Sequence, residues 1–238
     1  MRMRSGSLML VVAAVALLMV PFAAGQTNVS MSFNGNYSST SCVGPYGCVG
    51  AGLYGGTING VNVGQGQAVP GMICDDYFDN VTKGETWTAS GISVASLNSG
   101  NIASQTLFGA LIGVSGYTEV AYLANEMLTS KGLSSSQQGA ISEAIWFITS
   151  GGKSGSLDWL ASSYYNAAVA ALKAGATLSE FANLYLYTPN PRGKNEAQEM
   201  FSLVPMPEGG AALAYLLLAG ACCFGAMRFK HRQGRVGA

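Results

Sequence analysis

Two apolar stretches, one near each end of the 238-residue chain, constrain its fold more than any other feature. The first, residues 8–22, follows Arg2 and Arg4, and residues 23–25 are Ala-Ala-Gly. A basic start, an apolar run and small residues at the end are typical of a secretory signal peptide, so we expect cleavage before Gln26. An uncleaved N-terminal anchor is the alternative.

The second apolar stretch, residues 211–227, contains no charged side chain. A helix of this length, at about 1.5 Å per residue, is just long enough to cross about 30 Å of hydrocarbon. Basic residues that flank a membrane segment stay on the cytoplasmic side, so we expect the body of the chain to lie outside the cytoplasm. The basic residues that follow this stretch are Arg228, Lys230, Arg232 and Arg235.

A short motif precedes the second apolar stretch and consists of Val204, Pro205, Met206, Pro207, Glu208, Gly209 and Gly210. Together the motif, the apolar run and the basic tail resemble the PEP-CTERM sorting signal of exported bacterial proteins, with Gly209 where the commonest form has proline. The resemblance implies an exosortase-type membrane enzyme as a partner. A simple tail anchor is the alternative. We therefore expect a signal peptide at 1–25, an extracytoplasmic body at 26–203 and a sorting signal at 204–238.

The body is acidic and rich in glycine. Between residues 26 and 203 there are six Lys or Arg side chains against eleven Asp or Glu, and the six are not clustered. Nucleic-acid binding needs clustered cations to neutralise phosphates, so this class of partner is excluded. Glycine accounts for 32 residues and charged side chains for only 10% of the chain, a balance typical of secreted, loop-rich, largely β proteins.

The first half of the body has the pattern of strands. Val29, Met31 and Phe33 alternate with polar residues, as in a half-buried strand. Residues 57–63 contain Asn-Gly between β-branched residues, which predicts a tight hairpin. Further strands are expected at 71–77 and 86–97.

The second half changes to a helical period. Apolar residues line one face at 120–128, and Gly132 is expected to end that helix. Ser134 and Gln137 have the spacing of a capping box at the start of the next helix. A third helix is expected at 157–174 with Ser156 as its cap. Closing strands are expected at 183–187 and 199–204.

The expected fold is therefore α+β. A glycine-rich, sandwich-like or barrel-like N-terminal half precedes a segment of about three helices, and a C-terminal transmembrane helix follows the body.

The body contains three cysteines. Cys42 and Cys48 bracket a short loop that contains Gly and Pro, so we expect a local disulfide between them. Cys74 is then left unpaired, either as a reactive thiol or as a small buried residue that faces the core from a strand.

The residues around Cys74 and those from Ser142 to Trp146 resemble the two motifs of bacterial surface thioester domains. These segments are Met-Ile-Cys-Asp-Asp and Ser-Glu-Ala-Ile-Trp. In that family the cysteine bonds to a glutamine and the thioester captures amines on a partner surface. Here Ser142 stands at the glutamine position and cannot supply an acyl group. Gln138, one helical turn earlier on the same face, is the alternative acyl donor.

Other catalytic and metal sites have little support. His231, in the basic tail, is the chain's one histidine, which excludes a Ser-His-Asp triad or a His-ligated zinc site in the body. Three aspartates at 75, 76 and 79 lack the calcium-loop spacing, so a solvated acidic turn is favoured. We expect no metal and no cofactor. The carboxylates available to a glycan hydrolase are Asp75, Asp76, Glu143 and Asp158.

These patterns predict a non-enzymatic, membrane-anchored or exosortase-sorted protein of the cell surface or extracellular matrix, with a binding or adhesion role. Its expected partners are the membrane, the sorting enzyme, and extracellular polysaccharide or another envelope protein. The alternatives are a covalent thioester adhesin that uses Cys74 with Gln138, and an envelope glycan hydrolase.

Overall fold

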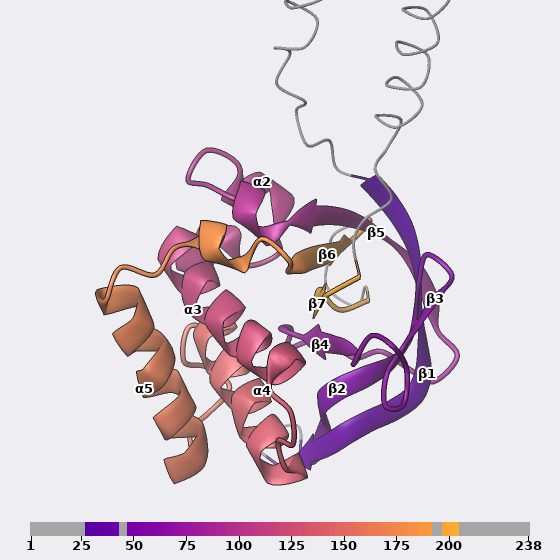
Figure 1. Cartoon of the computed structure of the whole chain (residues 1–238), viewed down its shortest axis with the longest axis horizontal. Helices are drawn as coiled ribbons and strands as arrows, with labels where there is room; N and C mark the ends of the chain where they lie inside the picture. Colours follow the sequence, from indigo (N-terminus) through magenta and orange to yellow (C-terminus); the bar gives the residue numbers. More distant parts are fainter. Residues whose placement is uncertain (1–26, 43–46, 192–196, 205–238) are drawn as a thin grey trace, which may run out of the picture.

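The structure is a computed structural model that describes residues 27–42, 47–191 and 197–204. It consists of a β-barrel with a group of helices packed along one side (Figure 1). The predicted α+β class with a barrel-like part is confirmed. The predicted signal peptide and the apolar stretch at 211–227 lie outside the described residues. Within the described ranges, no helix is both long and apolar enough to span a membrane.

Six antiparallel strands close the barrel in the order β1, β5, β6, β7, β4, β2, with β2 returning to β1. The short strand β3 pairs with β2 as an addition outside the ring. The strands are β1 Thr27–Ser41, β2 Val49–Ile58, β3 Val61–Val63, β4 Met72–Cys74, β5 Thr86–Ser93, β6 Tyr185–Pro189 and β7 Met200–Ser202.

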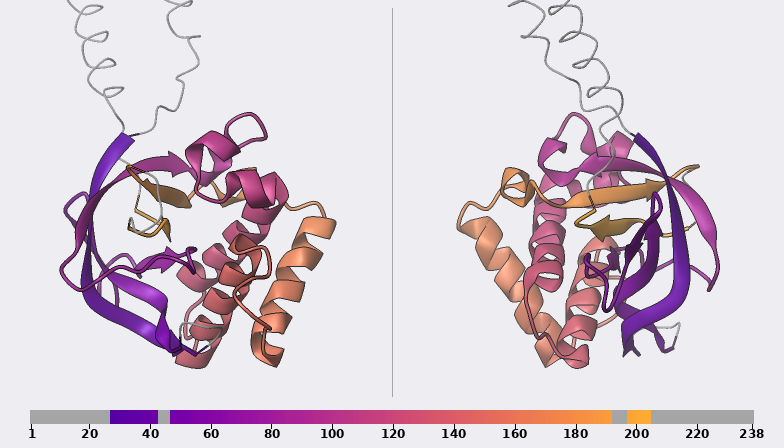
Figure 2. Two further views of the ribbon diagram at one scale, coloured as in Figure 1. Left: turned by 180° about the vertical axis from the view of Figure 1, so that it is seen from behind. Right: turned by 45° about the vertical axis from the view of Figure 1, so that its right-hand side comes forward.

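The described helices all come between β5 and β6 in the chain, and the longer ones lie side by side next to the barrel (Figure 2). The barrel is therefore completed only after the helices, by β6 and β7. The helices are α2 Ile102–Gln105, α3 Gly109–Thr129, α4 Ser135–Thr149 and α5 Trp159–Lys173, with 3-10 turns η1 Val94–Ser96 and η2 Leu178–Phe181.

Several local predictions are confirmed. Val29, Met31 and Phe33 point into the barrel. Asn59 and Gly60 form the hairpin turn between β2 and β3, both with positive φ, as a tight hairpin turn with this dipeptide requires. The capping box of α4 is present.

Several boundaries differ from expectation. The closing strands expected at 183–187 and 199–204 are Tyr185–Pro189 and Met200–Ser202, and α3 ends at Thr129, before Gly132. The strand expected at 71–77 keeps only Met72–Cys74, and the one expected at 86–97 gives way to η1 after Ser93. The third long helix begins at Trp159, not at 157, because Asp158 and not Ser156 is its cap. The Asp158 carboxylate accepts a hydrogen bond from the Ala161 amide at 2.7 Å and places negative charge at the helix N-terminus.

The molecule has two apolar cores, one inside the barrel and one between the barrel wall and the helices. Strand β4 serves both, because Met72 and Cys74 belong to the barrel core and Ile73 to the helical core. This alternation follows from the two-residue period of a strand. It places Cys74 where the two parts of the fold meet.

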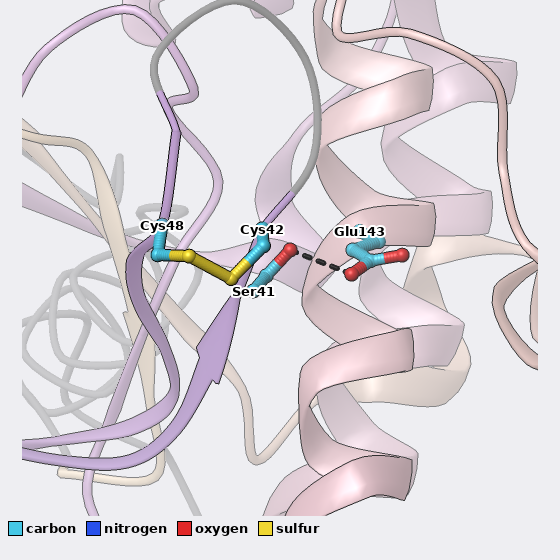
Figure 3. Close-up of a disulfide and its surroundings, with 4 residues drawn as sticks. All are labelled: Ser41, Cys42, Cys48 and Glu143. Carbon is cyan, nitrogen blue, oxygen red and sulfur yellow. Dashed lines mark hydrogen bonds between the residues drawn. A yellow bond between two sulfur atoms is a disulfide. The ribbon is translucent and has the colours of Figure 1, made fainter.

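The predicted disulfide between Cys42 and Cys48 is confirmed and joins the end of β1 to the start of β2. Ser41, the last residue of β1, donates a hydrogen bond to the Glu143 carboxylate of α4 at 2.6 Å (Figure 3). The disulfide therefore lies where the barrel meets α4. Cys74 is free and buried.

Candidate functional site

Helix α4 is attached to the barrel by a stripe of polar side chains along one face. Ser135 donates to the Ser38 carbonyl at 3.0 Å. About two turns further on, Ser142 accepts a hydrogen bond from the Gly52 amide at 2.9 Å. At the end of the helix, Thr149 donates to the Asp75 carbonyl at 2.6 Å. This face of α4 is thus an interface with backbone groups of β1, β2 and the β4 exit.

Trp146 is the apolar centre of that interface. Its ring is almost fully buried, and its Nε1 donates to the Cys74 carbonyl at 3.2 Å. The structure therefore brings together two of the sequence-predicted site residues, Cys74 and Trp146.

The Cys74 thiol is held by its own chain. Its Sγ donates to the Asp76 carbonyl at 3.0 Å and accepts from the Asp76 amide at 3.2 Å. Burial, and after it the negative charges of Asp76 and Asp75, raises the pKa of the thiol well above its usual range. The thiolate is the nucleophilic form, so these surroundings disfavour reactivity.

Gln138 and Ser142 are engaged elsewhere. The Gln138 carbonyl accepts from the Ser38 hydroxyl, and its Nε2 donates to the Leu133 carbonyl at 3.0 Å. Gln138 precedes Trp146 by two turns, about 12 Å along the helix axis. The Ser142 hydroxyl accepts a hydrogen bond from the Gly52 amide. Gly52 has a positive φ, and a Cβ there would clash with the Ser38 hydroxyl oxygen, so no side chain fits.

A buried acidic group lies on the other side of Cys74. Asp75 and Glu199 are both fully buried and Asp76 is 3% exposed. Glu199 accepts hydrogen bonds from the hydroxyls of Tyr117 and Thr188 and, at 3.0 Å, from the Leu107 amide. No donor within the described residues reaches either oxygen of Asp75.

Burial sets the charge states of this group. It raises the pKa of Asp75 well above its usual range, with the adjacent Glu199 carboxylate as the next cause. It also raises the pKa of Glu199, although the donors to that carboxylate lower it again. Both carboxyl groups therefore ionise less readily than free ones, and the charge on either disfavours ionisation of the other.

The expected solvated acidic turn is wrong for Asp75 and Asp76, because both are buried. Asp76 instead accepts from the amides of Phe78 and Asp79, at 2.9 and 3.3 Å, and so shapes the turn. In the described part of the chain, no three Asp, Glu, His or Cys side chains gather in a way that could hold a metal ion.

The four carboxylates considered for hydrolysis divide into two groups. Asp75 and Asp76 belong to the buried acidic group, whereas Glu143 accepts from Ser41 and interacts with the charge of Asp158. Asp158 itself caps α5. Asp76, Glu143 and Asp158 thus take part in hydrogen bonds that hold the fold, whereas neither oxygen of Asp75 has a partner within the described residues.

An open groove lies on the barrel wall beside β1 and β2. It begins where the pairing of these strands slips, since Phe33 faces Gly56 and Tyr37 faces Tyr54. Four steps along β1 thus match two along β2, and the extra residues bulge from the ladder. Bulges of this kind redirect side chains and are frequent beside functional sites.

The groove consists of two adjoining hollows of about 290 and 400 Å³, the size range of ligand sites. Their shared lining comes from the β1 bulge, from Gly55 on β2 and from the loop after β3. Most of the polar side chains around the groove are amides. Its lining includes Asn34, Asn36, Tyr37, Gly55, Gly56, Asn62, Gly64, Gln65, Gly66, Gln67 and Gln138.

Tyr37 forms one wall of the groove and is 49% exposed. Its ring lies directly on Gly50, where an added Cβ would be 2.8 Å from the ring. The same ring also borders a smaller pocket of about 70 Å³ that reaches Asp76 and Trp146. Tyr37 therefore separates the groove from the surroundings of Cys74.

No protein-family model, curated protein or solved structure matches this chain. Sequence reasoning missed the groove and Glu199. A signal for the groove exists in Asn34-Gly35-Asn36-Tyr37, which breaks the alternation of the first strand, and in the Gly-Gln-Gly-Gln of residues 64–67. Glu199 gives no comparable signal, because two of its partners, Leu107 and Tyr117, lie more than 80 residues earlier in the chain.

Proposed function

We propose that this chain is an exported protein of the bacterial cell envelope whose body binds its partner non-covalently. In this proposal a signal peptide directs export. Residues 204–238 act as a PEP-CTERM-type sorting signal that an exosortase-type enzyme recognises, so that the body is anchored at the surface or released into the extracellular matrix. Extracellular polysaccharide and envelope proteins are the partner classes considered.

The disulfide supports the choice of compartment, because such bonds form and persist in oxidising environments outside the cytoplasm.

The placement of the ends of the body also supports the proposal. Thr27 pairs with Gly91, Gly91 with Tyr187, and the Tyr187 hydroxyl donates to the Val204 carbonyl. Both ends therefore lie at the same end of the barrel. Tyr37 is ten residues further along β1, about 30 Å in an extended strand. A body anchored through either end would present the groove away from that anchor.

The observation that carries the non-covalent role is the environment of Cys74. Its thiol bonds to the backbone of Asp76, while the nearest candidate acyl donor on α4, Gln138, bonds to Ser38 and Leu133. A covalent adhesin would need these two side chains to meet. The open groove needs no rearrangement to receive a ligand.

Cell fractionation tests export and sorting. The full chain is expected in the envelope fraction and to begin at Gln26 when its N-terminus is sequenced. A variant that lacks residues 209–238 is expected to lose envelope retention and to accumulate as a soluble extracytoplasmic protein. An intact, unprocessed chain in the cytosol would contradict the proposal.

Intact-mass measurement tests the covalent alternative. The purified processed chain is expected to have the mass of the residues it retains, less the two hydrogens of the disulfide, before and after treatment with methylamine. A thioester between Cys74 and Gln138 would instead lower the mass by one ammonia, and methylamine would add to it. If that result were observed and the Gln138→Ala substitution abolished it, the protein would be a covalent thioester adhesin and the proposed non-covalent role would be wrong.

A further inference from the structure

We propose that the groove beside Tyr37 binds a neutral polysaccharide, with one sugar ring stacked on the tyrosine and neighbouring hydroxyls hydrogen-bonded by the surrounding amides. This inference rests on the non-covalent binding role proposed above and names the class of partner.

The amides of the groove are available to a ligand. Asn36, Asn62, Gln65 and Gln67 are exposed, and within the described residues their side chains make no hydrogen bond. Each carboxamide presents a donor and an acceptor side by side. A sugar hydroxyl also donates and accepts, so adjacent hydroxyls on a ring match this pattern.

The groove carries no charge to bind an ionic polymer. None of its lining residues is Asp, Glu, Lys, Arg or His. Lys83 lies beside it, but the Lys83 stem packs against Gly35 and is not part of the lining. The charges of an anionic polysaccharide or a strongly charged peptide would have no partner there, and their desolvation would be unfavourable. A neutral chain carries no charge that needs a partner.

Tyr37 supplies the apolar surface that such a ligand needs. Contact with Gly50 fixes one side of the ring, and about half of the residue stays exposed. A fixed ring loses little conformational entropy when a ligand packs on it. The C–H faces of a sugar ring are flat and apolar, and an aromatic face with a hydroxyl at its edge complements them.

A protein segment fits the groove less well. Protein interfaces are dominated by aromatic or apolar anchors that enter desolvated pockets. The apolar side chains of this lining are Leu53, Val63 and Pro70, of which Val63 is already buried in the barrel core. The groove therefore lacks a deep apolar pocket for an anchor, and its polar character favours the glycan.

The test is binding of the purified full chain, in mild detergent, to immobilised neutral polymers: amylose, dextran, galactomannan, cellulose and chitin. Retention on at least one of them is expected, and raising the salt from 50 to 500 mM is expected to change it less than twofold, because no ion pair forms. Soluble oligosaccharides of the retaining polymer then give the dissociation constant.

Groove variants locate the binding. Tyr37→Ala is expected to weaken binding at least tenfold, Tyr37→Phe to retain it within about threefold, and the double change Gln65→Ala with Gln67→Ala to weaken it at least fivefold. Trp159→Ala is the matched control, since that tryptophan is 79% exposed and lies on α5 outside the groove. It is expected to bind as the wild type does.

Each other outcome overturns the inference. These outcomes are no retention on any neutral polymer, retention that groove variants leave unchanged, retention only on anionic polymers that salt abolishes, and saturation of the groove by envelope peptides without glycan binding. The proposed export and non-covalent role fail separately, by fractionation and intact mass, so a failed glycan assay leaves them standing.

Discussion

Glu199→Ala is expected to lower the free energy of unfolding by about 3 kcal/mol or more, the range for breaking a buried polar network by removing one partner. The change leaves the Tyr117 hydroxyl and the Leu107 amide without an acceptor in a site closed to solvent, whereas the Thr188 hydroxyl keeps the Gln105 carbonyl as an acceptor. Relief of the repulsion between Glu199 and Asp75 offsets only part of this loss.

Urea unfolding at pH 7, followed by tryptophan fluorescence, measures the effect. Glu199→Gln keeps one acceptor oxygen and can donate to Asp75. This variant is therefore expected to lower the free energy of unfolding by only about 1 kcal/mol. Glu119→Ala is the matched control, because this carboxylate of α3 makes no hydrogen bond within the described residues. The substitution is expected to lower the free energy of unfolding by less than about 0.5 kcal/mol. If the Glu199→Ala variant had the same free energy of unfolding as the wild type, the hydrogen bonds to Glu199 would not stabilise the fold.

The sequence predicted those parts of the fold that depend on interactions between residues close together in the chain. The alternation of Val29, Met31 and Phe33, the Asn59-Gly60 turn and the Ser134 capping box each depend on residues close in sequence. Their geometry follows from strand pairing, positive φ and capping whatever the rest of the chain does.

Closure of the barrel depends on long-range pairing that no local pattern encodes. Strand β7 has three residues and pairs with β4, more than a hundred positions earlier. The same holds for Glu199, the residue before that strand. It accepts hydrogen bonds from Thr188 on the neighbouring strand and from Leu107 and Tyr117, which lie more than 80 residues earlier. From sequence alone, a charged side chain at the end of a strand is predicted to be exposed, because charged residues are rarely buried without partners.

The candidate site shows a similar division. The cysteine segment and the Ser-Glu-Ala-Ile-Trp segment were paired by resemblance, and Trp146 does bond to the Cys74 carbonyl. The groove was missed because strand bulges and loop positions create it, not a motif. Its amides stand at Asn36, Asn62 and Gln65, on segments that become neighbours only through β2 pairing with both β1 and β3.

The body is expected to lose stability as pH rises from about 4 to 7, and Asp76→Asn is expected to remove about 3 kcal/mol of that loss. Burial raises the pKa of Asp76 to about 6, from about 3.9 in an unfolded chain. A carboxyl whose folded pKa is raised contributes stability that is complete below the unfolded value and is lost as pH passes through the folded value. The loss attributable to Asp76 is therefore expected between about pH 4 and 6.

The asparagine variant isolates this contribution. Asn keeps the side-chain oxygen that accepts from Phe78 and Asp79 but does not titrate. Urea unfolding of both proteins at pH 4, 5, 6 and 7 should give free energies that diverge with rising pH, with the variant the more stable at pH 7. Asp75→Asn should diverge in the same direction, because burial and Glu199 also raise the pKa of Asp75. Parallel curves for both variants would mean that these carboxyl groups are hydrated in solution, and that the barrel and helices do not close over them.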